Sequence, residues 1–372
     1  MDEAIRDVHF LLLLGYGAFR MGSFISGIQQ VGIGVTDLDT SWRWYRRHFG
    51  MDVPIFHDSA DATFMVRYTG NTVHSRSAVL AINLRGGGGF EIWQFTSRTP
   101  EPAPFQVLPG DLGITAISLK TSKVSNLFAQ HKEAGIVAAD SASENPAGTP
   151  CYYTEDPDGN RFRIVESGAS FSRTRHSCGG VTGVEIGVRS IEPALRLYAD
   201  VLGYDRVVYD VQGEFDDMAG LGAGRVGRLR RVLLDQSHPG RGSFGRLFGA
   251  STIELFTSLD RKPRKLYENR FWGDCGFIHA CFDARDMDAL KLQSESSGFP
   301  FTVDSGGSFD MGEAEGRFAY TEDPDGTLIE VVETLKLPII AKLNIYLDLR
   351  KRSPDKPLPD WMLKTLRFSR VK

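Results

Sequence analysis

Cysteine could supply redox or metal chemistry, and this chain has four cysteines: Cys151, Cys178, Cys275 and Cys281. None of them forms a Cys-x-x-Cys pair, and no series of short spacings connects them. The sequence therefore indicates neither a zinc ribbon nor a disulfide framework. We expect reduced thiols in a cytoplasmic protein.

Arginine is concentrated in the stretch Gly224–Arg231, and glycine and arginine recur in the loop Gly240–Gly249. Either stretch could contact an anionic group. Arginines on a solvated hairpin are the more common explanation for such a pattern, so we assign no binding site to them.

Composition narrows the classes of partner. Of the residues, 41% are hydrophobic and 24% are charged, as in a soluble globular protein, and the formal net charge is -4. That charge gives no general reason to expect nucleic acid or an anionic membrane as a partner. The apolar run His9–Leu14 is far shorter than the roughly 20 residues of a membrane span, and no basic segment of a secretory signal precedes it.

The chain repeats itself. The segment Val31–Val35, followed by a helical run that ends at Gly50, returns as Val184–Val188 and a helical run that ends at Gly203. Each copy is typical of a strand, then an amphipathic helix with a glycine C-cap.

A second pair of segments matches in the same way. Ala116–Leu119 and a helix ending at Gly135 parallel His279–Phe282 and a helix ending at Gly298. The heptapeptide Tyr153–Gly159 returns letter for letter at Tyr320–Gly326. Seven identical residues in register indicate internal duplication, and we expect the turns at Asp156 and Asp323 to be equivalent.

Each helix is followed by strand-like segments, so the unit is a strand, a helix and three strands, and it occurs four times. Stretches rich in proline, glycine or small polar residues connect the units: Thr99–Gly110, Ser167–Gly180 and Lys262–Gly276. The last strands of the four units are Phe90–Phe95, Arg161–Val165, Thr252–Phe256 and Thr327–Val332.

The repeat predicts an α+β fold of four tandem βαβββ modules in two domains. Residues 25–168 hold modules one and two, and residues 180–335 hold modules three and four. Residues 1–24 are an N-terminal extension. We expect residues 336–372 to form a helical C-terminal extension, with two short helices separated by Ser353–Pro359, that packs across the body.

These features resemble the vicinal oxygen chelate superfamily, which includes glyoxalase I, methylmalonyl-CoA epimerase, extradiol dioxygenases and bleomycin-resistance proteins. The resemblance covers Ile25 to Thr334 and rests on the strand-helix-glycine unit and the Asp-Pro-Asp-Gly turn. It implies that modules pair and form curved sheets, each around a cavity. In single-chain relatives with four modules, module one pairs with four and module two with three.

The resemblance also implies where a metal would be held, because the family uses side chains from the first and last strands of its modules. Side chains alternate along a strand, so one residue per strand can point inward from a rigid floor. The corresponding positions in modules one to four are Gln30 and Glu91, Ala116 and Arg163, Gly183 and Glu254, and His279 and Glu330.

Modules one and four together supply Gln30, Glu91, His279 and Glu330, the ligand types and chain order of one branch of glyoxalase I. One imidazole, two carboxylates and one amide oxygen suit a divalent ion such as Zn, Ni, Mn, Fe or Mg. We expect these four residues to converge across the junction of the two halves. Alternation along the strand from Glu91 should also turn Trp93 toward the same cavity, and Phe90 and Ile92 toward the helices.

Modules two and three supply Ala116, Arg163, Gly183 and Glu254 at the same positions. An arginine there would oppose a dication, so this cavity is expected to be structural or a metal-free binding pocket. Arg163 and Glu254 should satisfy each other.

The resemblance to glyoxalase I implies a metal-dependent lyase or isomerase that transfers a proton next to a chelated carbonyl of a small oxygenated substrate. Glu330 would be the base and Glu91 the second carboxylate.

Two alternatives remain open. An extradiol-type dioxygenase would use His279 and Glu330, but its third ligand position holds Gly183, unless Glu254 supplies the ligand. A non-catalytic protein would only bind a small molecule. We expect a monomer or homodimer with a small-molecule substrate.

Overall fold

The computed structural model describes residues 22–221, 226–307, 309–311, 314–340 and 345–371. Most of the expected N-terminal extension, residues 1–24, therefore lies outside the described residues, and Phe24 already begins the first strand. Within the described part, no helix is long and apolar enough to span a membrane. All four cysteines are buried and free.

Module one has the expected order of elements. Its helix begins after Asp37, whose side chain accepts a hydrogen bond from the Thr40 amide, and ends at Gly50, whose φ of 67° is the left-handed conformation that glycine adopts readily. The elements of module one are β1 (Phe24–Gly34), α2 (Leu38–Phe49), β2 (Val53–Asp61), the 3₁₀ helix η1 (Thr63–Tyr68), β3 (Ser75–Ile82) and β4 (Gly89–Phe95).

The other modules repeat this order. Module two has β5 (Gly113–Thr121), α3 (Val124–Glu133), β6 (Ser143–Glu144), β7 (Pro150–Glu155) and β8 (Arg161–Glu166). Module three has β9 (Cys178–Gly187), α4 (Ile191–Tyr198), β10 (Arg206–Gly213), η2 (Asp216–Leu221), β11 (Leu229–Asp235), α6 (Gly245–Phe248) and β12 (Thr252–Ser258). Module four has β13 (Gly276–Arg285), α7 (Met287–Ser296), β14 (Val303–Asp304), β15 (Phe309–Met311), β16 (Ala314–Glu322) and β17 (Leu328–Ile340).

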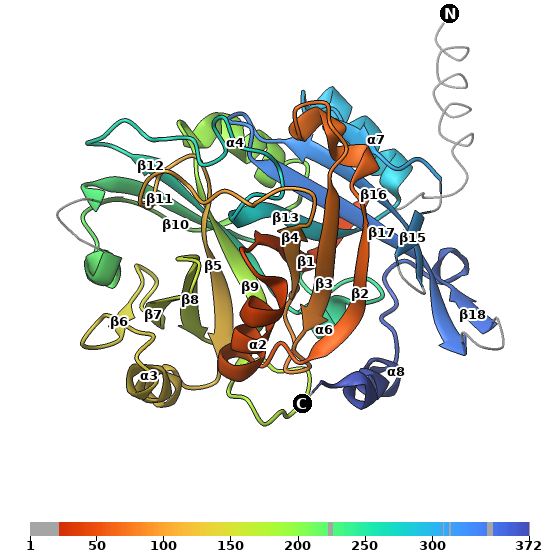
Figure 1. Cartoon of the computed structure of the whole chain (residues 1–372), viewed down its shortest axis with the longest axis horizontal. Coiled ribbons are helices and arrows are strands. Elements are labelled where there is room, and N and C mark those ends of the chain that lie inside the picture. Colours follow the sequence, from red (N-terminus) through yellow and green to blue (C-terminus); the bar gives the residue numbers. More distant parts are fainter. Residues whose placement is uncertain (1–21, 222–225, 308, 312–313, 341–344, 372) are drawn as a thin grey trace, which may run out of the picture.

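The modules pair as the resemblance implied. Modules four and one form one sheet, here called sheet A, with strand order β14-β16-β17-β13-β1-β4-β3-β2. Modules three and two form sheet B, with order β10-β11-β12-β9-β5-β8-β7-β6. Both sheets are therefore built from strands of both halves of the chain, and they run side by side through the middle of the molecule (Figure 1). The α+β fold of four modules in two curved sheets is confirmed.

The heptapeptide turns are equivalent, as predicted. Asp156 accepts hydrogen bonds from the amides of residues 158 and 160, and Asp323 accepts them from the amides of residues 325 and 327. The same carboxylates accept from the hydroxyls of Tyr45 and Tyr198, which lie on the helices of modules one and three. Each turn therefore links the two modules of one half: the first turn links modules one and two, and the second turn links modules three and four.

The largest hydrophobic cluster lies between the sheets and their helices. Phe90 and Ile92 belong to it together with Tyr45 of α2. Trp93 belongs to a separate cluster with Trp272 and Tyr320, on the face of sheet A that carries Glu91. The predicted orientation of β4 is confirmed.

The C-terminal region differs from the expected helical extension. Residues 336–340 continue strand β17, which pairs with β18 (Ile345–Asp348). Pairing keeps this segment extended, with Lys336 beside Asp348 and Leu337 beside Leu347 of β18. Helical turns follow only at η4 (Leu349–Lys351), α8 (Asp360–Lys364) and η5 (Thr365–Ser369).

These last turns pack on the body of the protein. Leu358 and Leu363 join a buried cluster with Val53 and Leu84 of module one and Phe248 of module three. Two arginines of the loop Gly240–Gly249 pair with this segment: Arg241 with Asp355, and Arg246 with Asp360. The loop therefore contacts the C-terminal segment rather than an external anion through these arginines.

Candidate metal centre

Four neighbouring strands of sheet A carry the residues that the sequence selects. Gln30 lies on β1, Glu91 on β4, His279 on β13 and Glu330 on β17. The pairing of β1 sets Gly32 beside both Glu91 and His279, and the pairing of β13 sets Cys281 beside Glu330. All four predicted side chains thus come from the centre of one sheet.

The acidic groups and the imidazole are in close contact. His279 Nε2 lies 3.2 Å from Glu91 Oε2 and 3.1 Å from Glu330 Oε2. The three ligand atoms lie within 4.8 Å of one another. Gln30 donates a hydrogen bond of 3.3 Å from its amide nitrogen to Glu91 Oε2. The structure therefore brings together all four residues of the predicted set.

The cluster holds two carboxylates and one imidazole, and this arrangement favours a cation at its centre. His279 is fully buried, and burial lowers the pKa of its imidazole. Glu330 and Glu91 outweigh this effect and raise the pKa of His279 to about 10. The two carboxylates therefore create a strong preference for positive charge at this point.

Three polar atoms of the cluster lack hydrogen-bond partners among the described residues: Gln30 Oε1, His279 Nε2 and Glu330 Oε2. His279 Nε2 and Glu330 Oε2 are close to each other but are not aligned for a hydrogen bond. A buried polar atom without a partner lowers the stability of the fold, so these three atoms indicate a site where a ligand binds. Together with the Glu91 carboxylate they form a donor set of oxygens and one imidazole nitrogen, which fits a divalent metal ion.

Space for the imidazole comes from Gly32. A Cβ atom on Gly32 would lie 2.5 to 2.9 Å from three ring atoms of His279. His279 Nδ1 also lies 3.4 Å from the hydroxyl of Tyr320. The ring is thus confined so that Nε2 faces the carboxylates.

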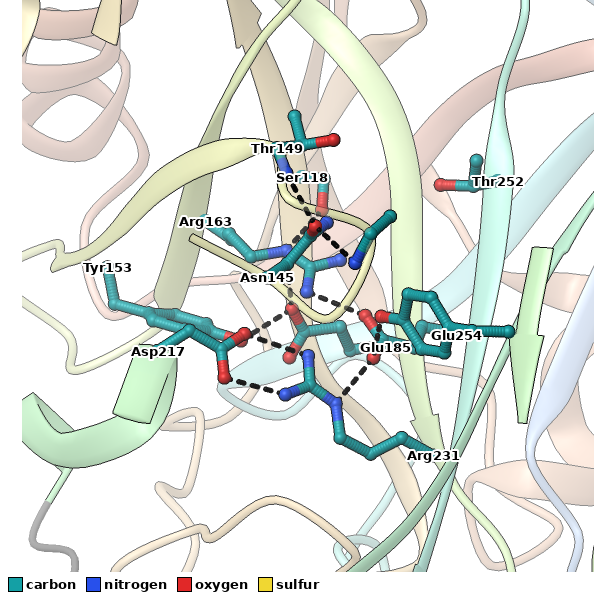
Figure 2. A network of polar contacts seen from close by, with 12 residues as sticks. Ser118, Asn145, Thr149, Tyr153, Arg163, Glu185, Asp217, Arg231, Thr252 and Glu254 are labelled. Atoms are coloured by element: carbon teal, nitrogen blue, oxygen red, sulfur yellow. Dashed lines mark hydrogen bonds and ion pairs between the residues drawn. The ribbon is translucent and has the colours of Figure 1, made fainter. Parts of the chain in front are cut away.

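In sheet B, ion-paired side chains occupy the positions that correspond to the metal ligands of sheet A. Arg163 Nη1 donates to Glu254 Oε2 at 2.6 Å, as the sequence predicted, and its Nε lies 3.0 Å from Glu185 Oε1. Figure 2 shows a second guanidinium, Arg231, which donates to Glu254 and forms two hydrogen bonds with Asp217.

Charge in this network is arranged around Glu254. Burial opposes its ionisation, but Arg163 and Arg231 lower the pKa of Glu254 to about 2. Burial and the Glu254 charge raise the pKa of Glu185. Two fixed guanidinium groups thus occupy the centre of sheet B, where they would repel a dication.

Glu185, Arg231 and Asp217 are members that sequence reasoning missed. In the match of Val184–Val188 to Val31–Val35, Glu185 occupies the position of Gly32. The repeat therefore already indicated that the Glu185 side chain points inward. Asp217 comes from η2, outside the strands of the repeat, and the repeat pattern does not mark it. The arginines of the stretch Gly224–Arg231 that precede Arg231 and are described also have partners: Arg228 pairs with Asp260, and Arg230 with Asp210 and Glu192.

The ligand set of the dioxygenase alternative is not formed. It requires Gly183 or Glu254 beside His279 and Glu330. Gly183 lies on β9 and Glu254 on β12, both in sheet B, whereas His279 and Glu330 lie in sheet A. The reason is the pairing of module three with module two, which separates its strands from those of module four.

Comparisons with known proteins agree with the fold. The model of the glyoxalase/bleomycin resistance protein/dioxygenase superfamily matches residues 27–164 and 180–331. Glyoxalase I from Zea mays is similar in structure, with a TM-score of 0.51 and 14% identity over 84% of this chain and 92% of that chain. A putative dioxygenase from Bacillus subtilis subsp. subtilis str. 168 has a TM-score of 0.52 and 13% identity over 94% and 97% of the two chains. No curated protein sequence matches the chain.

Proposed function

The chain belongs to the glyoxalase/bleomycin resistance protein/dioxygenase superfamily, and on that basis we propose that it is a metal-dependent lyase or isomerase. In this proposal it resembles glyoxalase I in transferring a proton at a carbon next to the carbonyl of a small oxygenated substrate. The observation that carries the proposal is the cluster of Glu91, His279 and Glu330, with their ligand atoms within 4.8 Å of one another.

Gln30, Glu91, His279 and Glu330 would hold one divalent cation. Bound there, the cation would act as a Lewis acid toward the substrate carbonyl and so make the neighbouring C–H bond more acidic. Glu330 is the base in this proposal, because its carboxylate has one oxygen without a partner among the described residues and its side chain is still 9% exposed. It would take the proton from one carbon and return it to the same carbon or its neighbour, so the reaction needs no co-reactant.

Glu91 has a different environment. The Gln30 amide donates to Oε2 of Glu91, which orients that carboxylate toward His279. A carboxylate restrained in this way is suited to holding the cation. Two acidic residues in unlike surroundings can therefore divide the roles of ligand and base.

The test measures metal content and proton exchange separately. The full chain is stripped with a chelator, loaded with zinc and analysed for bound metal. Exchange of the carbon-bound hydrogens of hydroxyacetone for deuterium is followed by NMR in D₂O. We expect one zinc per chain and zinc-dependent exchange. His279→Ala should lose most of the metal, whereas Glu330→Gln should keep part of it and lose exchange, because an amide is a poor base.

Glu185→Gln is the matched control, since Glu185 lies in sheet B and its substitution should change neither measurement. Absence of bound zinc, or exchange that persists in Glu330→Gln at the wild-type rate, would refute the proposal. Oxygen consumption by an iron-loaded protein without proton exchange would favour a dioxygenase. A metal-free protein that binds hydroxyacetone without exchange would favour simple sequestration.

A further inference from the structure

Two tryptophans form a wall beside the candidate metal centre. The ring of Trp272 is nearly parallel to that of His279, with 12° between the planes and 6.3 Å between the centroids. Trp93 packs across Trp272 at 4.3 Å and 71°. Tyr320 stands at right angles to His279 and Trp272, with its centroid 5.4 and 6.3 Å from theirs. The candidate ligand His279 is therefore part of an aromatic enclosure.

Both indoles have a donor without an acceptor. Trp93 and Trp272 are each 5% exposed, and neither Nε1 has a hydrogen-bond partner in the described part of the chain. A buried indole N–H normally finds an acceptor. Together with the orphaned atoms of Gln30, His279 and Glu330, these two nitrogens make this face of sheet A a cluster of unused polar groups.

Sheet B shows that the fold does not require these tryptophans. Trp93 stands two residues after Glu91, and Phe256 stands two residues after Glu254. The loop Trp272–Asp274 corresponds to the loop Pro109–Asp111, and the aspartate carbonyls of both loops lie against glycines of the neighbouring first strands. Sheet B thus builds the same strand and the same loop without an indole at either position.

We propose that Trp272 and Trp93 form a binding site for an aromatic ring of the substrate, and that the Trp272 N–H donates to a substrate oxygen. This rests on the proposed function, which accounts for the carbonyl and its neighbouring hydroxyl. The substrate class is an aryl ketone that carries a hydroxyl on the carbon next to the carbonyl. Its ring packs against the indoles, as aromatic pairs do at centroid separations of about 4.5 to 7 Å.

The surroundings of the wall fit an apolar substituent. Ala78, Met65 and Ile278 are buried in the same hydrophobic cluster as the two tryptophans, and Phe318 is partly buried against it. A charged substituent would lose its hydration there without gaining an ion-pair partner from these side chains. An uncharged ring loses little hydration and gains dispersion contacts.

The test compares two ligands that differ by one ring, 2-hydroxyacetophenone and hydroxyacetone, by calorimetric titration of the zinc-loaded full chain. We expect the aryl ligand to bind at least tenfold more tightly. Trp272→Phe should weaken both ligands about fivefold, the equivalent of one neutral hydrogen bond, and leave their ratio unchanged. Trp272→Leu should bring the ratio to less than threefold, with zinc affinity unchanged.

Pro109→Ala changes the corresponding residue of sheet B and should leave both affinities at the wild-type value. Equal affinities of the two ligands for the wild-type chain would overturn the inference, and so would a Trp272→Leu variant with the wild-type ratio. Zinc-dependent exchange of hydroxyacetone is measured on the same preparation. If that exchange is present and the two ligands bind equally, only the aromatic assignment fails. If exchange and bound zinc are absent, the proposed function itself fails.

Discussion

His279 can occupy the floor of sheet A because the residue beside it, Gly32, has no side chain. In sheet B the sizes are exchanged: Glu185 stands at the position of Gly32, and Ala116 stands at the position of His279. Each sheet thus has room for one large side chain at this pair of positions. The identity of that side chain, an imidazole or a carboxylate, decides what the centre can bind.

A methyl group at residue 32 tests this dependence. In Gly32→Ala the new Cβ would meet ring atoms of His279 at 2.5 to 2.9 Å, so the imidazole must shift. Displacement of a ligand ring should lower zinc affinity about 10- to 100-fold, as loss of supporting contacts does in metal sites. Competition with a chromophoric chelator measures this. Gly168→Ala, where a Cβ would meet nothing within 4 Å, should keep the wild-type affinity.

The residues of the candidate centre could be read from the sequence because they occupy repeated strand positions. Gln30, Glu91, His279 and Glu330 follow from the register of the four modules. Trp272 could not be found in this way, because it lies in a loop where only the following Gly-Asp is shared with the other half. Asp217 was equally hidden, since η2 approaches Arg231 only in the folded chain.

At the scale of elements, each heptapeptide turn joins the two modules of its own half through a buried carboxylate. Burial raises the pKa of Asp323 to about 6, although hydrogen bonds from the Thr327 amide and Tyr198 partly oppose this. Burial raises the pKa of Asp156 to about 6 in the same way. A carboxyl whose pKa is higher in the folded than in the unfolded chain stabilises the fold when protonated, and it loses this contribution as the pH rises.

We therefore expect a pH-dependent difference between the wild-type chain and Asp323→Asn. The Asp323 contribution should be fully present below about pH 4 and lost as the pH rises through about 6. A shift from 3.8 to about 6 corresponds to about 3 kcal/mol. Urea unfolding at pH 4 and pH 7 measures it: the stability of the wild type relative to the variant should fall by about this amount. A difference that stays constant over this range would show that the carboxyl titrates alike in both states.

The turns were predictable as elements, whereas the C-terminal strand was not. Seven identical residues in each copy predict the turns directly. Strand β18 is specified by pairing with β17, whose extension beyond Thr334 has no counterpart in the other three modules. A contact between segments that do not repeat leaves no periodic signal, and a proline at position 338 further favours reading the region as a break.

At the scale of the whole molecule, duplication produced two sheets, and among the described residues the candidate metal centre lies in sheet A. Sheet B retains a carboxylate at the matching position, Glu254, but fills the centre with Arg163 and Arg231. Both arginine side chains are at most 3% exposed, and Glu254 is fully buried. In such a place the guanidinium groups stand where a metal would, so we expect zinc to bind with a stoichiometry of one per chain.

Removal of one member of this network should therefore affect stability and not metal content. Arg163→Ala removes one of the two guanidinium groups that pair with Glu254, and it removes the cation that pairs with Glu185. The two carboxyl groups of Glu185 and Glu254 then face each other without Arg163 between them. Breaking a buried ion pair on one side costs about 3–5 kcal/mol, because the remaining charge is buried without its partner. Arg206→Ala removes an ion pair whose arginine is 65% exposed and should leave the stability nearly unchanged, because solvent screens such a pair. Urea unfolding measures both variants, and zinc analysis of each should still give one ion per chain. A stable Arg163→Ala chain that binds a second zinc would mean instead that Arg163 alone keeps sheet B free of metal.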